Sequence, residues 1–217
     1  MHYFSENPNS KHNETTIKGT INNKVLSFNT DAGIFSPNYV DKGSQILVNY
    51  SEFKKDDDIL DMGCGYGAIG ISLADDVNSV VMTDINKRSV SLAKQNVKLN
   101  HVKNKNITVL QGNLYEEVPK DSKFDVIISN PPIKAGKVII HQIISEGLEY
   151  LKPNGKIYVV IKTKHGAKSL TDFMEKTYGN VEIVKIKSGY RVLCSVNNLN
   201  NKNIQDTNDN PDNTDTN

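Results

Sequence analysis

Between residues 58 and 196, short apolar runs alternate with longer segments in which apolar residues recur every three or four positions. The short runs have the length of buried strands, and the longer segments have the period of amphipathic helices. Strands are predicted at 59–61, 80–83, 107–110, 124–128 and 157–161, and helices at 68–74, 87–99, 138–151 and 167–178. Such alternation predicts a parallel sheet with helices on both faces.

Two further pairs of apolar runs have only a short polar turn between them. These strands are expected at 15–20 and 24–28, and at 181–187 and 190–196. Their turns are Asn22-Asn23 and Ser188-Gly189, residue types that favour antiparallel hairpins. The second hairpin would complete a seven-stranded mixed sheet, and the first would be an N-terminal extension. The fold class is therefore α/β.

We divide the chain into three parts. Residues 1–50 would form the N-terminal extension, a hairpin followed by a helix from Asp41 to Tyr50, and residues 51–196 the α/β domain. Residues 197–217 are rich in Asn, Asp and Thr, a composition that predicts a disordered tail. Pro153-Asn154-Gly155 is expected to end the helix at 138–151 before the next strand.

Charge separates the tail from the rest of the chain. The 217 residues carry a formal net charge of +1. The tail holds Lys202 and four aspartates and thus carries −3, which leaves +4 for residues 1–196. A weakly basic body is compatible with RNA as a partner, but this charge alone does not demonstrate RNA binding.

The sequence also bears on location and metal content. No apolar run approaches the length of a membrane span, and the N-terminus lacks a basic region followed by an apolar core. Cys64 and Cys194 have no metal-ligand spacing, and the five histidines are scattered. We expect a cytoplasmic protein with reduced thiols, no membrane partner and no metal, and we favour a monomer.

A glycine-rich turn follows the strand at 59–61 and precedes a helix. It reads Asp61-Met62-Gly63-Cys64-Gly65-Tyr66-Gly67-Ala68-Ile69-Gly70, and Asp84 ends the next strand. Glycines let a ligand approach the main chain, and an acidic residue at that spacing can bind ribose hydroxyls. The context predicts a nucleotide-type ligand, although a tight structural turn is the alternative.

A second motif, Asn130-Pro131-Pro132-Ile133, follows the apolar strand at 124–128. The two prolines stop strand pairing and stiffen the backbone, so Asn130 offers rigid hydrogen-bond acceptors at the carboxyl end of a strand. In open α/β sheets this edge binds ligands. Rigid paired acceptors could hold an NH₂ group and orient its nitrogen for attack, whereas the plainer interpretation is a turn that ends the strand.

Together these motifs resemble class I S-adenosylmethionine-dependent methyltransferases, which have a Rossmann-like fold. Asp-x-Gly-x-Gly-x-Gly resembles their cofactor turn, and Asn130-Pro131-Pro132-Ile133 is similar to the Asn-Pro-Pro-aromatic motif of amino methyltransferases. Three stretches, 33–36, 41–47 and 189–192, extend the resemblance to the methyltransferase small domain of the small-subunit ribosomal RNA guanine-N2 methyltransferases. The resemblance covers roughly residues 30–196.

The resemblance implies S-adenosylmethionine as cofactor and ribosomal RNA or a ribosomal subunit as partner. It implies cofactor binding by Asp61, Gly63, Gly65, Gly67, Asp84, Asn113 and Asn130, and catalysis by Asn130, Pro131, Pro132 and Ile133. The chain departs from the family in two ways: a second, degenerate domain is replaced by a short extension, and Ile133 stands where many relatives have an aromatic residue.

Several alternatives stay open. Enzymes with Asn-Pro-Pro also methylate glutamine side chains and the adenine amine, a nicotinamide dehydrogenase could use the glycine pattern, and a non-catalytic RNA-binding module could keep the fold. Lys134 and Lys164 lie just beyond strand ends, where they could contact phosphates, and Arg191 lies in the last hairpin. A solvated rim explains these three residues equally well.

Overall fold

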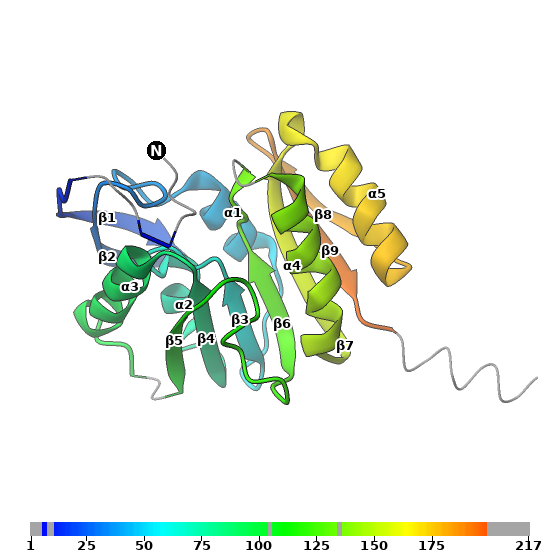
Figure 1. Ribbon diagram of the computed structural model, residues 1–217, viewed down its shortest axis with the longest axis horizontal. Helices are drawn as coiled ribbons and strands as arrows, with labels where there is room; N and C mark the ends of the chain where they lie inside the picture. Colours follow the sequence, from blue (N-terminus) through cyan, green and yellow to red (C-terminus); the bar gives the residue numbers. More distant parts are fainter. Residues whose placement is uncertain (1–5, 8–10, 104–105, 134–135, 199–217) are drawn as a thin grey trace, which may run out of the picture.

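The alternating segments form a seven-stranded mixed sheet in the order β5-β4-β3-β6-β7-β9-β8 (Figure 1). The structure is a computed structural model, and it describes residues 6–7, 11–103, 106–133 and 136–198. The strands are β3 (Asp58–Met62), β4 (Ser79–Asp84), β5 (Ile107–Gln111), β6 (Phe124–Ser129), β7 (Leu151–Lys162), β8 (Glu182–Lys187) and β9 (Tyr190–Val196). β3 to β7 are parallel, and β9 runs antiparallel to both β7 and β8.

Helices cover both faces of this sheet, as the sequence predicted. They are α1 (Lys42–Tyr50), α2 (Ala68–Leu73), α3 (Lys87–Leu99), α4 (Lys137–Tyr150) and α5 (Ala167–Tyr178), with a short 3₁₀ turn, η2 (Thr163–His165), before α5. Neighbouring residues of β3 point to opposite faces. Ile59 joins the core beneath α1, α2 and α3, whereas Leu60 joins the core beneath α4 and α5. Burial on both faces explains why the central strands read as continuous apolar runs.

The order of the strands creates a ligand-binding position. The chain runs outward from β3 through β4 to β5 and then returns to the other side of β3 to form β6. Because β3 and β6 lead their following helices away in opposite directions, a crevice opens beyond their carboxyl ends. The glycine turn follows β3 and Asn130 follows β6, so the fold brings the two sequence motifs to the same crevice.

The N-terminal hairpin forms as a separate two-stranded sheet, β1 (Thr15–Ile21) and β2 (Lys24–Thr30). Asn22 and Asn23 adopt φ values of 53° and 56°, the left-handed conformation that a two-residue hairpin turn requires. Ile21 and Phe28 are buried in the core that also contains β3 and α2 residues. Residues between Ile21 and Val48 thus contribute to the same hydrophobic core as the α/β domain.

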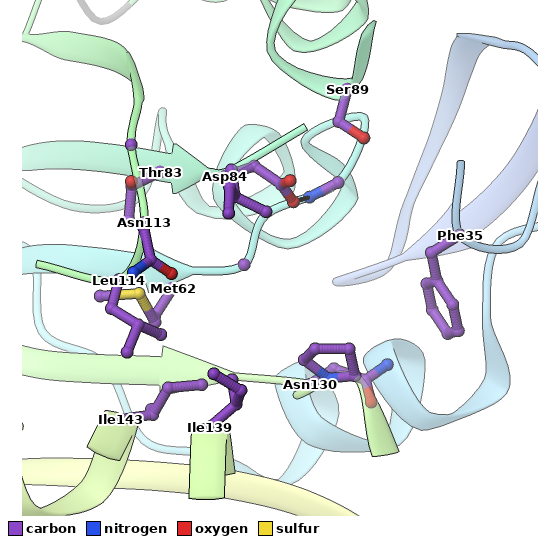
Figure 2. A pocket seen from close by; sticks show the side chains of 15 residues that line it. Phe35, Met62, Thr83, Asp84, Ser89, Asn113, Leu114, Asn130, Ile139 and Ile143 are labelled. Carbon is purple, nitrogen blue, oxygen red and sulfur yellow. Dashed lines mark hydrogen bonds between the residues drawn. The ribbon is translucent and has the colours of Figure 1, made fainter. Parts of the chain in front are cut away.

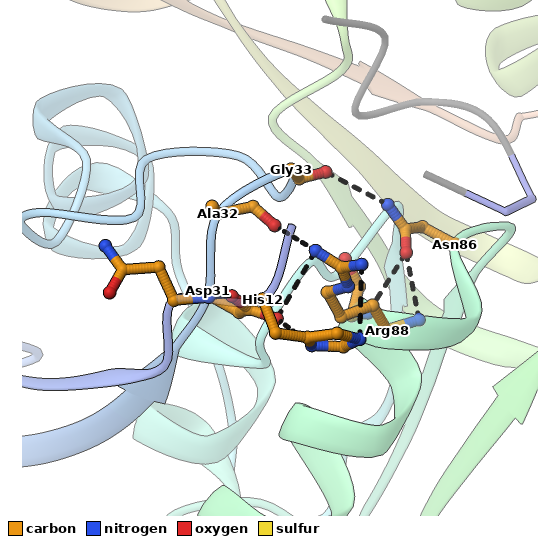
Figure 3. Close-up of polar contacts among 8 residues, drawn as sticks. His12, Asp31, Ala32, Gly33, Asn86 and Arg88 are labelled. Carbon is orange, nitrogen blue, oxygen red and sulfur yellow. Dashed lines mark hydrogen bonds and ion pairs between the residues drawn. The ribbon is translucent and has the colours of Figure 1, made fainter. Parts of the chain in front are cut away.

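Polar contacts fasten the loop after β2 to the start of α3 (Figure 3). Asp31, which is 1% exposed, accepts from His12 and lies 3.3 Å from the Arg88 guanidinium. Arg88 also donates to the carbonyl of Ala32, and Asn86 Nδ2 donates to that of Gly33 at 3.4 Å. These contacts place the loop at residues 31–39 beside the segment that follows β4.

The same contacts bear on a possible cation site. His12, Glu14 and Asp31 bring candidate ligand atoms within 4.8 Å of one another. However, both oxygens of Asp31 already accept hydrogen bonds, from His12 at 2.6 Å and from the Asn13 N–H at 2.5 Å, and Arg88 adds a positive charge. Asp31 is therefore already engaged in polar contacts that anchor the N-terminal region.

The boundary between α4 and β7 differs from the sequence prediction. The strand begins at Leu151 rather than 157, and Pro153-Asn154-Gly155 lies within it as an irregularity that shifts the register with β6. Asn154 adopts φ 62°, and Asn197 exchanges backbone hydrogen bonds with Asn154 and Gly155 at 2.9 and 2.8 Å. Asn197, which the sequence assigned to the tail, is thus part of the fold, and residues 199–217 lie outside the described residues.

Within the described ranges, no helix is both long enough and apolar enough to cross a bilayer.

Candidate active site

A cavity of about 320 Å³ occupies the crevice at the carboxyl ends of β3, β4, β5 and β6 (Figure 2). Figure 2 shows Asp84 and Asn130 on opposite sides of this space, with Phe35 at one end and Asn113 with Leu114 at the other. The lining residues are Phe35, Met62, Gly63, Gly65, Thr83, Asp84, Ile85, Ser89, Gly112, Asn113, Leu114, Asn130, Pro132, Ile139 and Ile143. The cavity is mainly apolar with a few polar groups, which is typical of small-molecule sites.

The glycines of the turn after β3 serve two different purposes. Gly63 and Gly65 line the cavity at φ 73° and 57°, and a Cβ atom on either would meet no protein atom within 4 Å. In contrast, a Cβ on Gly67 would lie 2.8 Å from Ile71 Cδ1, and one on Gly70 would lie 2.5 Å from Met82 Sδ. The first two glycines therefore leave space for a ligand, whereas the last two allow close packing of α2.

Asp61 lies behind the turn rather than in the cavity lining. Its side chain is fully buried, and Oδ2 accepts from the Gly70 N–H at 2.9 Å, which holds the start of α2 against β3. No described residue donates to Oδ1. Burial raises the pKa of Asp61 to about 7, and the Gly70 hydrogen bond opposes this shift. Direct cofactor contact by Asp61 stays a prediction.

Asp84 presents a carboxylate to the cavity in a fixed orientation. Oδ2 accepts from the Gly65 N–H and Oδ1 from the Asn86 N–H, each at 2.8 Å. Burial raises the pKa of this carboxyl to about 6, although the two hydrogen bonds favour the ionised form. Each oxygen retains a lone pair, so the pair can accept from two adjacent hydroxyl groups such as those of a ribose.

The far end of the cavity is an apolar slot. Met62, Leu114, Ile139 and Ile143 line it, and Asn113 lies at its edge. The Asn113 amide donates to Glu116 Oε1 at 3.3 Å. A flat aromatic base fits such a slot, because apolar walls cover its faces while a polar side chain meets its edge. This placement is compatible with the cofactor binding that the resemblance implies for Asn113.

Asn130 is held from the opposite side by α1. Its Nδ2 donates to Asp41 Oδ2 and to Ser44 Oγ, both at 2.9 Å. A carboxylate only accepts hydrogen bonds, so the amide nitrogen must be the atom that faces Asp41. Among the described residues none donates to Asn130 Oδ1, and this oxygen remains as the acceptor that the side chain can offer to a ligand.

The rest of the Asn-Pro-Pro motif divides between the cavity and the core. Pro131 is buried, Pro132 lines the cavity, and Ile133 is partly buried against the core beneath α4 and α5. An aromatic side chain does reach the cavity, but it is Phe35, from the loop that follows the N-terminal hairpin.

The three predicted substrate-binding residues have different surroundings. Lys134 lies outside the described residues. Lys164 is exposed in η2, beyond the end of β7. Arg191 is half-buried in β9, and its Nε has no hydrogen-bond partner in the described part of the chain. Asp41 and Ser44 were missed as site residues, although the stretch at 41–47 that carries them had been singled out.

Comparison with known proteins places these features in a family. The sequence profile of the methyltransferase small domain matches residues 25–194. The uncharacterized protein YbxB of Bacillus subtilis is 38% identical over 88% of this chain and 96% of its own length. Ribosomal RNA small subunit methyltransferase C of Hamiltonella defensa is 27% identical over 78% of this chain and 50% of its own length, so the chain spans about half of that relative.

Two further comparisons concern the acceptor and the fold. A putative protein N5-glutamine methyltransferase of Methanocaldococcus jannaschii is 32% identical over 66% of this chain and 81% of its own length. A solved T. thermophilus 16S rRNA guanine-N2 methyltransferase, in complex with AdoMet and guanosine, superposes with a TM-score of 0.75 at 23% identity. The superposition covers 87% of this chain and 52% of that protein, and at this identity it shows the shared fold.

Proposed function

Because this chain belongs to the methyltransferase small domain family and is an S-adenosylmethionine-dependent methyltransferase, we propose that it methylates the exocyclic amine of a guanine in ribosomal RNA. The family match decides against the nicotinamide dehydrogenase that the glycine pattern had left open. We propose the cytoplasm as the place where the protein acts on its substrate.

The proposal assigns the two sides of the cavity to the two substrates. Asp84 accepts from the ribose hydroxyls of the cofactor, and Gly63 and Gly65 leave room for its amino acid end. The adenine enters the slot beside Asn113 and Leu114. Asn130 then faces the reactive methyl group from the other side of the cavity, which Pro132 also lines. Asp61 supports the turn from behind through Gly70.

The observation that carries the proposal is the orientation of Asn130. Its oxygen is left to accept from a ligand because its nitrogen is bound to Asp41 and Ser44. The acceptor must therefore bring a hydrogen-bond donor, and an exocyclic amine brings two N–H groups. The amine nitrogen attacks the methyl carbon, the S–C bond breaks with its electron pair left on sulfur, and the methylated amine loses a proton to water. The enzyme supplies position and orientation, since the sulfonium is already activated.

Exposed lysines beside the site are compatible with RNA as the acceptor. Near the cavity, Lys137, Lys162 and Lys164 are exposed and make no ion pair within the described part of the chain. At the opposite edge of the sheet, Lys152 contacts Asp58 and Asp125 at 2.8 and 2.7 Å. Lysines without carboxylate partners beside the site are suited to contact phosphates.

The test is transfer of labelled methyl groups to three acceptors: undermodified small ribosomal subunits, their isolated RNA, and total protein from the same cells. We expect label in RNA, recovered as N2-methylguanosine after nucleoside digestion, and no label with Asn130→Ala. Label on protein glutamine would replace RNA by the alternative that the glutamine methyltransferase relative supports. Label on adenine would contradict guanine, and RNA binding without transfer would contradict an enzyme.

A further inference from the structure

The first turn of α1 contacts Asn130 although it lies in the N-terminal part of the chain. Asp41 is the N-cap of this helix, and its Oδ2 accepts from the Ser44 N–H at 3.1 Å. The same oxygen accepts from Asn130 Nδ2 at 2.9 Å, and Ser44 Oγ accepts from it at the same distance. One helix end thus uses two of its polar side chains on a single amide group 86 to 89 residues away in the sequence.

We propose that Asp41, with Ser44, is a positioning residue that fixes the amide of Asn130 in the orientation that accepts from the acceptor amine. This inference rests on the function proposed above. An asparagine side chain that rotated by half a turn would place its oxygen against the Asp41 carboxylate, where two acceptors would repel, whereas the Ser44 hydroxyl can either donate or accept. Asp41 therefore selects the rotamer in which Oδ1 is left for the substrate.

The position of this turn is itself fixed by packing. A Cβ on Gly43 would lie 2.8 Å from Asp41 Oδ2 and 2.9 Å from Cε1 of Tyr190. The glycine thus lets the start of α1 lie directly against the Tyr190 ring on β9. This contact brings the sequence stretches 41–47 and 189–192 together in the folded protein. The turn is held by β9 on one side and reaches Asn130 at the end of β6 on the other.

The orientation matters because an amine and an amide NH₂ are both donors. If Asn130 were free to rotate, part of the population would present its own NH₂ to the amine and leave the amine hydrogens without an acceptor. Such molecules could bind cofactor normally but would not hold the amine in line with the methyl group. We expect a loss in turnover rather than in cofactor affinity.

Three variants separate positioning from helix capping. Asp41→Ser keeps an N-cap hydroxyl that can accept from the Ser44 N–H, but its oxygen lies one bond closer to the backbone and does not reach Asn130. Asp41→Asn keeps a side-chain oxygen of the original reach and tests rescue. Asn49→Ala, an exposed position on the same helix, is the matched control.

The first readout needs no acceptor substrate. The side-chain NH₂ signal of Asn130, assigned by its absence in Asn130→Ala, is followed by hydrogen exchange in ¹⁵N-labelled protein. We expect slow exchange in the parent and in Asn49→Ala, partial retention in Asp41→Asn, and fast exchange in Asp41→Ser. Fast exchange in the parent protein would overturn the proposal, because the two hydrogen bonds would then not hold the amide.

The second readout is single-turnover methyl transfer with cofactor titration on the same samples. Asp41→Ser should lose about 10- to 100-fold in rate with cofactor affinity unchanged, the scale expected when a reacting group is displaced. Asp41→Asn should recover most of this loss. In the Asn130→Ala background, Asp41→Ser should add no further loss, because it acts through Asn130.

These outcomes keep the two proposals distinct. If Asp41→Ser transfers methyl groups at the parental rate, or lowers the rate equally with and without Asn130, the positioning role is wrong. If the parent protein methylates no guanine acceptor, the proposed function fails while the exchange measurement still decides the positioning role.

Discussion

On one side of the cavity, the groups proposed to face the ribose and the amino acid end of the cofactor come from residues 62–89, which run from the end of one strand through a turn, a helix and a strand to the start of the next helix. On the other side, Asn130 is held by Asp41 and Ser44, which lie 89 and 86 residues earlier. The cofactor side is organised by backbone groups, since Asp84 accepts from the N–H groups of Gly65 and Asn86. The acceptor side is organised by side chains.

The two sides of the cavity should respond differently to substitutions. On the cofactor side, backbone hydrogen bonds from Gly63 and Cys64 to the Thr83 carbonyl hold the turn independently of the side chains, so damage there should stay with the replaced group. The acceptor side depends on the packing of α1 against β9 and β6, so distant substitutions can misplace Asn130. Substitutions on the two sides should therefore change different kinetic quantities.

The largest effect is expected from Asn130→Ala, which breaks the acceptor side alone. The acceptor amine becomes positive as the methyl group transfers, so the hydrogen bond to Asn130 Oδ1 strengthens in the transition state. We expect turnover to fall by roughly 100-fold or more, the scale for loss of one preorganised polar group aimed at developing charge. Cofactor affinity should be nearly unchanged. Single-turnover transfer and calorimetry on one sample measure both quantities.

A folded Asn130→Ala protein with the parental rate would remove the catalytic role of the motif. Asn130 would then only mark the end of β6, which is the plainer interpretation that the sequence allowed. Circular dichroism and thermal melting serve as the control for folding, because loss of two hydrogen bonds to α1 could loosen that helix.

The next largest effect is expected from Asp84→Ala, which changes the cofactor side of the cavity alone. It removes the carboxylate expected to accept from the ribose hydroxyls and also the bonds to Gly65 and Asn86. We expect cofactor binding to weaken by about 1–3 kcal/mol, the range for hydrogen bonds to a charged group. Calorimetric titration with S-adenosylhomocysteine measures it. Unchanged affinity in a folded variant would place the ribose elsewhere.

The contrast between the two sides also explains what could be predicted from the sequence. Asp84 was identified because the motif and its structural role lie within one strand–turn–helix unit, whose spacing is visible along the chain. The role of Asp41 was not, because a stretch such as 41–47 shows residue types but not the distant group they contact. The seven-stranded sheet was predicted correctly, since period and length distinguish strands from helices.

Two local expectations show the limits of turn signals. Pro153-Asn154-Gly155 indicates an irregular backbone, but it did not reveal that pairing with β6 and Asn197 continues around it. Similarly, the glycine pattern at 63–70 does not show which glycines face a ligand. Only the packing of Ile71 and Met82 separates Gly67 and Gly70 from the two cavity-lining positions.

A smaller effect should appear when pH is lowered. Ribose hydroxyls donate to the ionised Asp84 carboxylate, whose pKa in the unliganded protein is about 6. Affinity should therefore be full above that pH and fall below it, by up to about tenfold per pH unit. Cofactor affinity is measured by calorimetry across this pH range for the parent protein and for Asp84→Asn. Comparing the two profiles removes the contribution of the amino group of the cofactor. A pH profile identical to that of Asp84→Asn would contradict the assignment.

As pH is lowered, the contribution of Asp84 to the free energy of unfolding of the unliganded protein should change in the direction opposite to the change in cofactor affinity. The folded-state pKa of Asp84 is raised above its ordinary value of 3.8, so the folded state binds the proton more tightly than the unfolded state. This carboxyl therefore opposes folding most strongly above about pH 6, and its unfavourable contribution disappears as pH falls toward 4. Asp61, with a pKa of about 7, acts in the same sense.

The smallest effect is expected at the rim of the acceptor side. Lys164 is exposed in η2 without an ion pair in the described residues, whereas Lys156 contacts Glu52 at 2.8 Å near the opposite edge of the sheet. If Lys164 contacts an RNA phosphate, Lys164→Ala should weaken RNA binding only a few-fold and lower the slope of log affinity against log salt by about 1. Lys156→Ala is the matched control and should leave that slope unchanged.

The measurement is RNA affinity over a salt series, with cofactor affinity measured beside it. Because loss of one counterion-releasing contact changes the slope whereas a packing defect does not, an unchanged slope in Lys164→Ala would place this lysine on the solvated rim and leave the RNA contacts to other residues.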